Sequence, residues 1–128
     1  MKVPHGYMRV GAIDIGSNSI RLLVADIAAG SEPGELVTVA RAGESCRLGR
    51  GLEKTGAVDG EMGERAATVA GEFARRARSL GAAHTVVGAT AALRRAENGA
   101  AVAAAIGERT GLRVRILSGQ DEARLVYQ

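Results

Sequence analysis

Three short apolar runs open the chain, and each has the length of a β-strand. They cover residues 9–15, 20–27 and 35–43. Only residues 16–19 separate the first two runs, which predicts a tight antiparallel hairpin. The dipeptide Pro33-Gly34 marks the turn into the third run. The pattern therefore predicts a meander of three sequential strands.

A long amphipathic helix is predicted over residues 59–80. Its apolar side chains recur at helical spacing and therefore share one face. They are Met62, Ala66, Val69, Ala70, Phe73, Ala77 and Leu80. Asp59 is the expected N-cap, and Gly81 stands where helices commonly end with a left-handed glycine.

Strand and helix patterns alternate again in the last third of the chain. We expect a strand at 84–90, a connecting turn, a helix at 100–110, a strand at 113–117 and a further helix from Ser118. A strand, a helix and a strand in succession predict a parallel right-handed crossover. The order β-β-β-α-β-α-β-α indicates an α/β domain, with a mixed five-stranded sheet and helices on both faces. Because the helical pattern still runs at Gln128, we interpret the chain as one lobe of a longer protein.

Composition narrows the classes of function. The chain has 128 residues, of which 46% are hydrophobic but only 2% aromatic, so few side chains could stack on nucleic-acid bases. The net charge of +3 is modest, and we expect no nucleic-acid partner. The single cysteine, Cys46, excludes an intramolecular disulfide and a cysteine-based zinc site. With no bilayer-length apolar run and no signal-peptide pattern, we expect no membrane partner and a cytoplasmic protein. Residues 1–8 are expected to form a flexible tail.

The stretch "DIGSNS" places an acid, a glycine and three small polar residues at the first hairpin. We expect the Asp14 carboxylate, at the end of a buried strand, to need a partner, and Mg²⁺ with substrate phosphate oxygens is one candidate. Gly16 is expected to adopt a positive φ and to admit a ligand closely, so that successive N–H groups form an anion-binding nest. Ser17, Asn18 and Ser19 could add hydrogen bonds to phosphate oxygens. An ordinary Asx-type turn is the alternative.

Arg94 follows the strand predicted at 84–90, at the end of a sheet where α/β proteins bind ligands. Its planar fork suits phosphate oxygens, and Arg95 is expected to face elsewhere. A surface arginine in a loop is the alternative interpretation.

Asp121 and Glu122 lie in the first turn of the last predicted helix. Acids there stabilise the helix dipole, and one of them could instead act as a general base. Since neighbours on a helix point about 100° apart, only one is expected to face a site, and the pattern does not say which.

Four stretches together resemble the exopolyphosphatase / guanosine pentaphosphate phosphohydrolase (Ppx/GppA) family: "AIDIGSNSIRLLVAD", "RLGRGL", "GATAALRRAENG" and "LSGQDEARLVY". That family belongs to the sugar kinase–Hsp70–actin superfamily of ribonuclease H-like lobes. The resemblance implies a two-lobed phosphatase with its active site between the lobes. Residues 9–128 would form the N-terminal actin-like lobe, and the second lobe is absent from this chain.

The resemblance also implies roles for individual residues. Residues 14–19 match the first phosphate loop, with Asp14 in the Mg²⁺-associated position. Arg21 and Arg94 match positions that contact substrate phosphates, and Glu122 matches the catalytic glutamate. The full-length protein would then use Mg²⁺ to hydrolyse the terminal phosphoanhydride of inorganic polyphosphate or guanosine pentaphosphate. We also expect it to form a homodimer, and we expect the isolated chain to be inactive.

Three alternatives stay open at this point. The two substrates are not separated by the residues present. A sensor that binds phosphorylated ligands without cleaving them is a second class, which the presence of Glu122 disfavours. A ribonuclease H-like nuclease ranks last, because two-metal chemistry needs several clustered carboxylates. Asp121 stands where the family usually has a second glutamate, and the charge is kept.

Overall fold

The computed structural model describes residues 3–28 and 36–117. Its elements are β1 (Tyr7–Ile15), β2 (Ser19–Ala28), β3 (Leu36–Ser45), α1 (Leu52–Thr55), α2 (Gly60–Ser79), β4 (His84–Ala89), α3 (Ala91–Arg95), α4 (Gly99–Thr110) and β5 (Val114–Ile116). The order predicted from the sequence is confirmed as far as β5, with the short helices α1 and α3 in addition. The first strand begins at Tyr7, inside the expected tail. The helix expected from Ser118 lies outside the described residues.

The strands form one mixed sheet in the order β3-β2-β1-β4-β5. The predicted meander is confirmed, because β2 pairs antiparallel with both β1 and β3. The crossover strands β4 and β5 are parallel, and β4 is also parallel to β1. Alternation sets the register, since Ile13, Ile15 and Leu22 are buried while Asp14 and Arg21 are exposed. A slip of one residue would move every apolar side chain to the other face.

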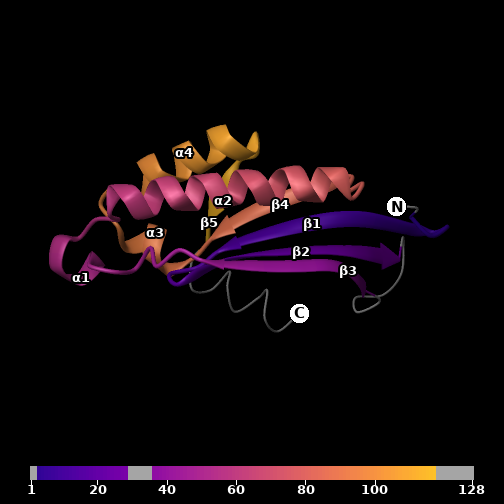
Figure 1. The fold of residues 1–128 in the computed structure, drawn as a ribbon, viewed down its shortest axis with the longest axis horizontal. Coiled ribbons are helices and arrows are strands. Elements are labelled where there is room, and N and C mark those ends of the chain that lie inside the picture. The colour runs from indigo at the N-terminus through magenta and orange to yellow at the C-terminus, as the bar shows by residue number, and fades with distance from the viewer. Residues whose placement is uncertain (1–2, 29–35, 118–128) are drawn as a thin grey trace.

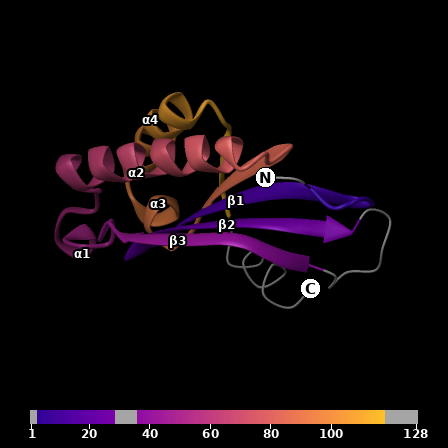
Figure 2. The same ribbon diagram turned by 45° about the vertical axis from the view of Figure 1, so that its right-hand side comes forward.

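The long helix α2 lies between the sheet and α4 (Figures 1 and 2). Both helices cover the same face of the sheet. The opposite face exposes apolar side chains such as Met8, Ile27 and Val86. Cover of that second face by a helix stays a prediction, since the last expected helix is not among the described residues.

Helix α2 is buried on two faces. The apolar face predicted from the sequence is confirmed, with Met62 and Leu80 half-buried at its ends. A second row of small residues is also buried: Gly63, Ala67, Gly71 and Ala74. A Cβ at Gly71 would lie 3.2 Å from the Arg109 carbonyl oxygen, so these residues let α4 approach closely. No described helix is long and apolar enough to cross a membrane.

The ends of α2 follow the expected capping. The Asp59 carboxylate accepts hydrogen bonds from the amides of Glu61 (2.9 Å) and Met62 (3.3 Å). Gly81 follows the helix with φ 87°, in the left-handed region. Both predictions are confirmed, and they place the turn into β4 beside the start of β1, where the Ala83 amide donates to the Arg9 carbonyl (2.8 Å).

A buried ion pair joins β1 to β2. Arg9 and Asp26 face each other in register, with Nε–Oδ1 at 2.8 Å and Nη2–Oδ2 at 2.9 Å. A third donor, Nη1, bonds the Leu80 carbonyl at the end of α2 (2.8 Å). These hydrogen bonds offset the cost of removing both charges from water. The bonds from Arg9 hold the pKa of Asp26 below its usual range, and Asp26 in turn raises the pKa of Arg9.

Replacing Asp26 with Asn should lower the free energy of unfolding at neutral pH, because Arg9 would stay buried without its counter-charge. In the parent chain the pair also makes stability depend on pH. Since the folded-state pKa of Asp26 is lowered, its contribution is complete above the unfolded value of about 3.9. It is lost as the pH falls through the folded-state pKa. Urea unfolding of the chain at neutral and acidic pH, followed by circular dichroism, measures both effects.

The matched control is Glu72→Gln, which removes an exposed carboxylate from α2. It should leave the free energy of unfolding nearly unchanged. An Asp26→Asn chain as stable as the parent at neutral pH would contradict the role given to the pair.

Candidate functional site

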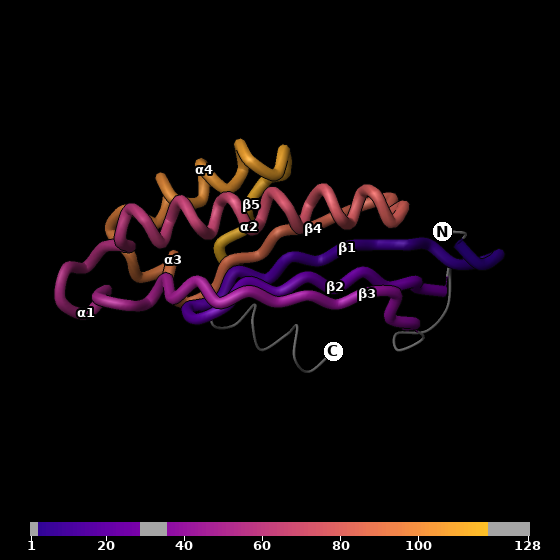
Figure 3. Tube along the Cα trace, in the orientation of Figure 1, coloured from indigo at the N-terminus to yellow at the C-terminus, as the bar shows by residue number. Residues whose placement is uncertain are grey.

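Three connections meet at one end of the sheet (Figure 3). They are residues 16–18 between β1 and β2, residues 46–51 between β3 and α1, and α3 after β4. The topology causes this meeting, because parallel β1 and β4 end at the same edge and β3 returns to it alongside β2. Most of the site residues predicted from the sequence lie at or just after the carboxyl ends of β1 and β4.

The turn at residues 16–18 closes with a hydrogen bond from the Gly16 amide to the Ser19 carbonyl (2.9 Å). The expectation that Gly16 adopts a positive φ is wrong, because Gly16 is not among the glycines that do. Glycine is needed here for space instead. A Cβ would lie 3.3 Å from the Ser19 carbonyl oxygen, which is tighter than an ordinary contact.

Residues 46–49 hold the carbonyl groups of this turn. The amides of Cys46 (3.0 Å) and Arg47 (3.2 Å) donate to the Asn18 carbonyl. The Gly49 amide donates to the Ser17 carbonyl (2.9 Å). In a trans peptide unit the C=O and N–H point in opposite directions, so the N–H groups of Asn18 and Ser19 face away from residues 46–49.

The turn amides have the arrangement of an anion-binding nest. Within residues 3–28 and 36–117, the N–H groups of Ser17 and Asn18 donate to no protein acceptor. Successive unpaired N–H groups in a turn attract anions. The side chains of Ser17 and Ser19 are half-buried beside them, and that of Asn18 is exposed.

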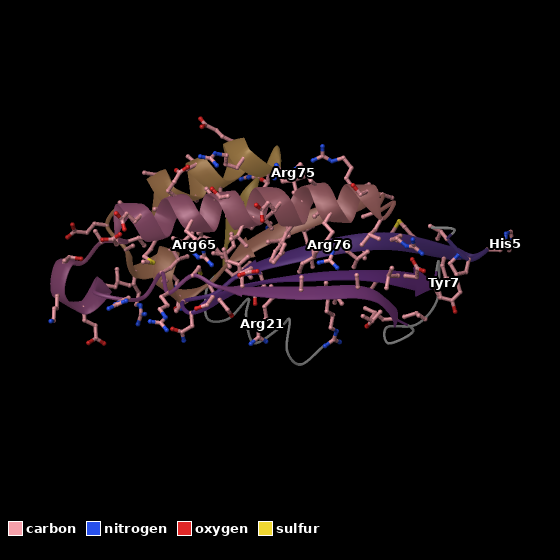
Figure 4. All side chains as sticks on the ribbon, in the orientation of Figure 1. His5, Tyr7, Arg21, Arg65, Arg75 and Arg76 are labelled. Atoms are coloured by element: carbon pink, nitrogen blue, oxygen red, sulfur yellow. The ribbon has the colours of Figure 1, made fainter. Side chains whose placement is uncertain are left out.

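Asp14 and Arg21 lie opposite each other on neighbouring strands. They are register partners of β1 and β2, and both are exposed. Figure 4 shows Arg21 on the face of the sheet away from α2. Strand alternation directs Asp14 to the face away from α2, where its side chain is exposed, and its predicted need for a partner stays a prediction. On its other side Asp14 pairs with Gly88 of β4, which adds no side chain.

The donor set around Asp14 fits only one mode of Mg²⁺ binding. In the part of the chain that the structure describes, no three His, Cys, Asp or Glu side chains gather as a metal site. Mg²⁺ commonly takes one or two carboxylates and completes its shell with water and substrate phosphate oxygens. Asp14 could supply one such carboxylate, and the rest of the shell would come from water and substrate.

The two arginines of α3 diverge. The Arg94 guanidinium donates from Nη1 to the Leu117 carbonyl just beyond β5 (2.6 Å). Contrary to our expectation that Arg95 faces away, its side chain lines a pocket together with Ser17 and Asn18. Helix α3 is held to the turn by the Thr90 amide, which donates to the Ile15 carbonyl (3.0 Å). Arg94 therefore reaches the end of β5, and Arg95 reaches the turn.

The pocket beside the turn has a volume of about 550 Å³. It is lined by Ser17, Asn18, Ser45, Arg47, Gly49, Arg50 and Arg95. Sequence analysis assigned no role to its three arginines, although two of them lie in the "RLGRGL" stretch. Glycines on both sides of Arg50 were the signal that this stretch bends sharply.

Cys46 packs beneath the turn. Its side chain is buried, with Sγ 3.9 Å from the Gly16 carbonyl oxygen. Burial raises the pKa of this thiol. Arg65 of α2 steadies the preceding residue, because its Nε donates to the Ser45 carbonyl (3.1 Å). The thiol therefore packs against the turn, and its rate of chemical modification depends on whether the turn stays in place.

The structure thus brings Asp14, residues 16–19 and Arg21 to one end of the sheet, and it places Arg94 on the neighbouring α3. Glu122 and Asp121 lie outside the described residues. Their roles stay predictions.

The sequence matches the model of the Ppx/GppA phosphatase family over residues 23–128. Among curated proteins, exopolyphosphatase 1 of Mycobacterium leprae and that of Mycobacterium tuberculosis are each 32% identical over 120 residues. The aligned region is 94% of this chain and 34% of each relative. The chain therefore spans about a third of the length of these relatives.

Solved structures show the same fold. The crystal structure of the Aquifex aeolicus member of the Ppx/GppA family superimposes with a TM-score of 0.85 at 30% identity, covering 94% of this chain and 38% of that one. An exopolyphosphatase from Cytophaga hutchinsonii gives a TM-score of 0.81 at 25% identity, covering 92% and 36%. The actin-like fold implied by the sequence resemblance is confirmed.

Replacing Gly49 with Ala should destabilise the chain by about 1 kcal/mol, as overpacking commonly does. The new Cβ would lie 3.3 Å from the Ser17 Cβ and would push the turn away. We also expect Cys46 to react faster with the disulfide reagent DTNB, since the loosened turn opens more often. Denaturant unfolding and the rate of thiol modification measure the two effects.

Gly60→Ala is the matched control, because a Cβ there meets nothing within 4 Å. It should be neutral or stabilising by up to about 1 kcal/mol. Equal thiol reactivity in both variants would show that Gly49 does not hold the turn.

Proposed function

Because the chain belongs to the Ppx/GppA phosphatase family, we propose that its full-length protein hydrolyses the terminal phosphoanhydride bond of linear polyphosphate. One observation carries the proposal. The turn at residues 16–18 gives its carbonyl groups to residues 46–49 and leaves its amides facing the other way. Such a turn binds phosphate oxygens without needing a side-chain charge. The relatives named exopolyphosphatase support the choice of substrate.

The proposed reaction is an in-line attack by water on the terminal phosphorus. Turn amides and the side chains of Ser17, Asn18 and Ser19 hold the oxygens of the reacting phosphate. Glu122 orients the water and takes its proton, which general-base catalysis requires within hydrogen-bond reach. Mg²⁺ beside Asp14 would offset the charge that develops on the phosphate oxygens.

Arg21 and Arg94 complete the proposed phosphate contacts. Arg21 lies across the strand pair from Asp14 and is exposed on the same face. Arg94 is exposed on α3, beside the end of β5. A guanidinium fork binds phosphate oxygens in a bidentate manner. The two arginines, one on β2 and one on α3, would approach the substrate from different elements and fix its direction.

Guanosine pentaphosphate is the second candidate substrate, which the name GppA in the matching family supports. We further propose that the protein works in the cytoplasm as a homodimer. A single buried cysteine fits a reducing compartment.

Glu122→Gln in the full-length protein should abolish phosphate release while polyphosphate still binds. The amide keeps the size of the side chain but cannot accept the proton of the attacking water, and general-base loss commonly costs about 10²–10⁴-fold in rate. Phosphate release measured by malachite green, and binding measured by calorimetry, separate the two effects.

Asp121→Asn is the matched control, since adjacent residues of the helix predicted from Ser118 would point about 100° apart. It should keep most of the activity. Wild-type turnover by Glu122→Gln would remove the proposed base. A wild-type protein that binds polyphosphate without releasing phosphate would instead support a sensor.

The isolated chain of 128 residues should release little or no phosphate. It spans about a third of its curated relatives, so most of the contacts of a two-lobed site would be missing. Turnover by the purified chain at the rate of the full-length protein would contradict this expectation.

A further inference from the structure

The pocket beside the turn is strongly cationic. Among the residues that the structure describes, its lining contains Arg47, Arg50 and Arg95 and no carboxylate. All three arginines are exposed, and across residues 3–28 and 36–117 their side chains form no hydrogen bond or ion pair with another protein group. Three like charges around one pocket repel each other, and an anion between them would remove that repulsion. The pocket volume, about 550 Å³, is that of a small-ligand site.

The backbone around Arg47 is held in an unfavourable conformation. Arg47 has φ 48° and is the one non-glycine residue with positive φ in the described ranges. Such a conformation costs on the order of 1–3 kcal/mol and persists where surrounding structure enforces it. Here the Arg47 amide is held by the Asn18 carbonyl, and its carbonyl accepts from the Arg50 amide (3.1 Å). The chain thus keeps Arg47 and Arg50 beside the turn at a cost in strain.

The third arginine comes from a distant part of the sequence. Arg95 lies on α3, whose exit is fixed by a bond from the Glu97 amide to the Gly56 carbonyl (2.8 Å). The same loop is clamped by Asn98, which bonds both the amide (2.8 Å) and the carbonyl (3.0 Å) of Val58. The connection that carries Arg47 and Arg50 and the helix that carries Arg95 are therefore held so that the three arginines converge on one pocket.

The pocket lies beside the site proposed for cleavage, with Ser17 and Asn18 on the border between the two. Its walls include Ser45, Arg47, Gly49 and Arg50, whereas the amides of Asn18 and Ser19 face away from residues 46–49. We propose that the pocket is a second phosphate subsite, which binds internal phosphates of a linear polyphosphate while the terminal phosphate occupies the amide side of the turn. This inference rests on the proposed function.

The chemistry of the lining selects this ligand. Guanidinium groups bind phosphate oxygens as forks, and the Ser17 hydroxyl and the Asn18 amide side chain add neutral donors. A linear polyphosphate carries a charge on every unit and can reach both sides of one turn. The phosphates of a nucleotide such as guanosine pentaphosphate have similar chemistry. The experiment below distinguishes such a nucleotide from linear polyphosphate.

The test uses the full-length protein with Arg50→Ala and Arg95→Ala combined. Arg47 is left in place, because a substitution there would also change the backbone. We expect KM for long-chain polyphosphate to rise about a hundredfold more than KM for tripolyphosphate, since each of the two removed guanidinium groups contributes on the order of tenfold in affinity through charge-assisted hydrogen bonds. An unchanged ratio of the two KM values would overturn the proposal. So would a rise for guanosine pentaphosphate as large as for long-chain polyphosphate, because the pocket would then hold the nucleotide.

The control is Arg75→Ala combined with Arg76→Ala, which removes the same charge from the exposed surface of α2 (Figure 4). It should leave both KM values unchanged. If it raises KM for long-chain polyphosphate as much as the test variant does, the effect comes from the overall positive charge of the protein, and the subsite is refuted.

A binding measurement keeps this inference separate from the proposed function. If the wild-type protein releases no phosphate, the proposed function fails, and calorimetric titration with long-chain polyphosphate still tests the pocket. Arginines that contact phosphates make the affinity fall as the salt concentration rises. The slope of the logarithm of the binding constant against the logarithm of the salt concentration should therefore become shallower by roughly one to two units in the test variant. Equal slopes for the wild-type and variant proteins would refute the subsite.

Discussion

The site depends on the hydrogen bonds by which residues 46–49 hold the carbonyl groups of the first turn. Three amide donors from one loop satisfy two acceptors of another, so neither loop keeps its shape alone. The bonds orient the turn amides outward, bury Cys46 beneath them and bring Arg47 to the rim of the pocket. An anion site made of backbone groups needs this kind of support, because a turn without it could rotate its peptide units.

The rest of the fold keeps those loops in reach of each other. Strand β1 is held at its start by the buried pair of Arg9 with Asp26 and at its end by the bond from Thr90 to the Ile15 carbonyl. Helix α2 packs on the sheet with one face and on α4 with small residues on the other. Asn98, which lies between α3 and α4, ties this connection to the residues before α2 through its two hydrogen bonds with Val58. The positions of Arg94 and Arg95 follow from this packing.

Charge is distributed unevenly around the turn. On the face of the sheet away from α2, the exposed Asp14 and Arg21 are register partners, so this face carries one negative and one positive side chain side by side. The charged side chains that line the pocket, among the described residues, are all arginines. A substrate with one reacting end and a long anionic remainder fits this difference in charge between the two sides of the turn. The end needs balanced groups and a metal-binding carboxylate, whereas the remainder needs only positive charge.

The sequence by itself determined the strands, the caps of α2, the α/β class and the "DIGSNS" turn, because periodicity and capping are local properties. Tertiary structure decided the rest. The second buried face of α2 carries only glycine and alanine, and small residues give no apolar signal until a neighbour packs on them. The exposure of Asp14 depended on which face the helices cover, and the place of Arg95 depended on the rotation of a short helix. The arginine pocket joins residues about fifty positions apart, and only the meeting of β1, β3 and β4 at one edge brings them together.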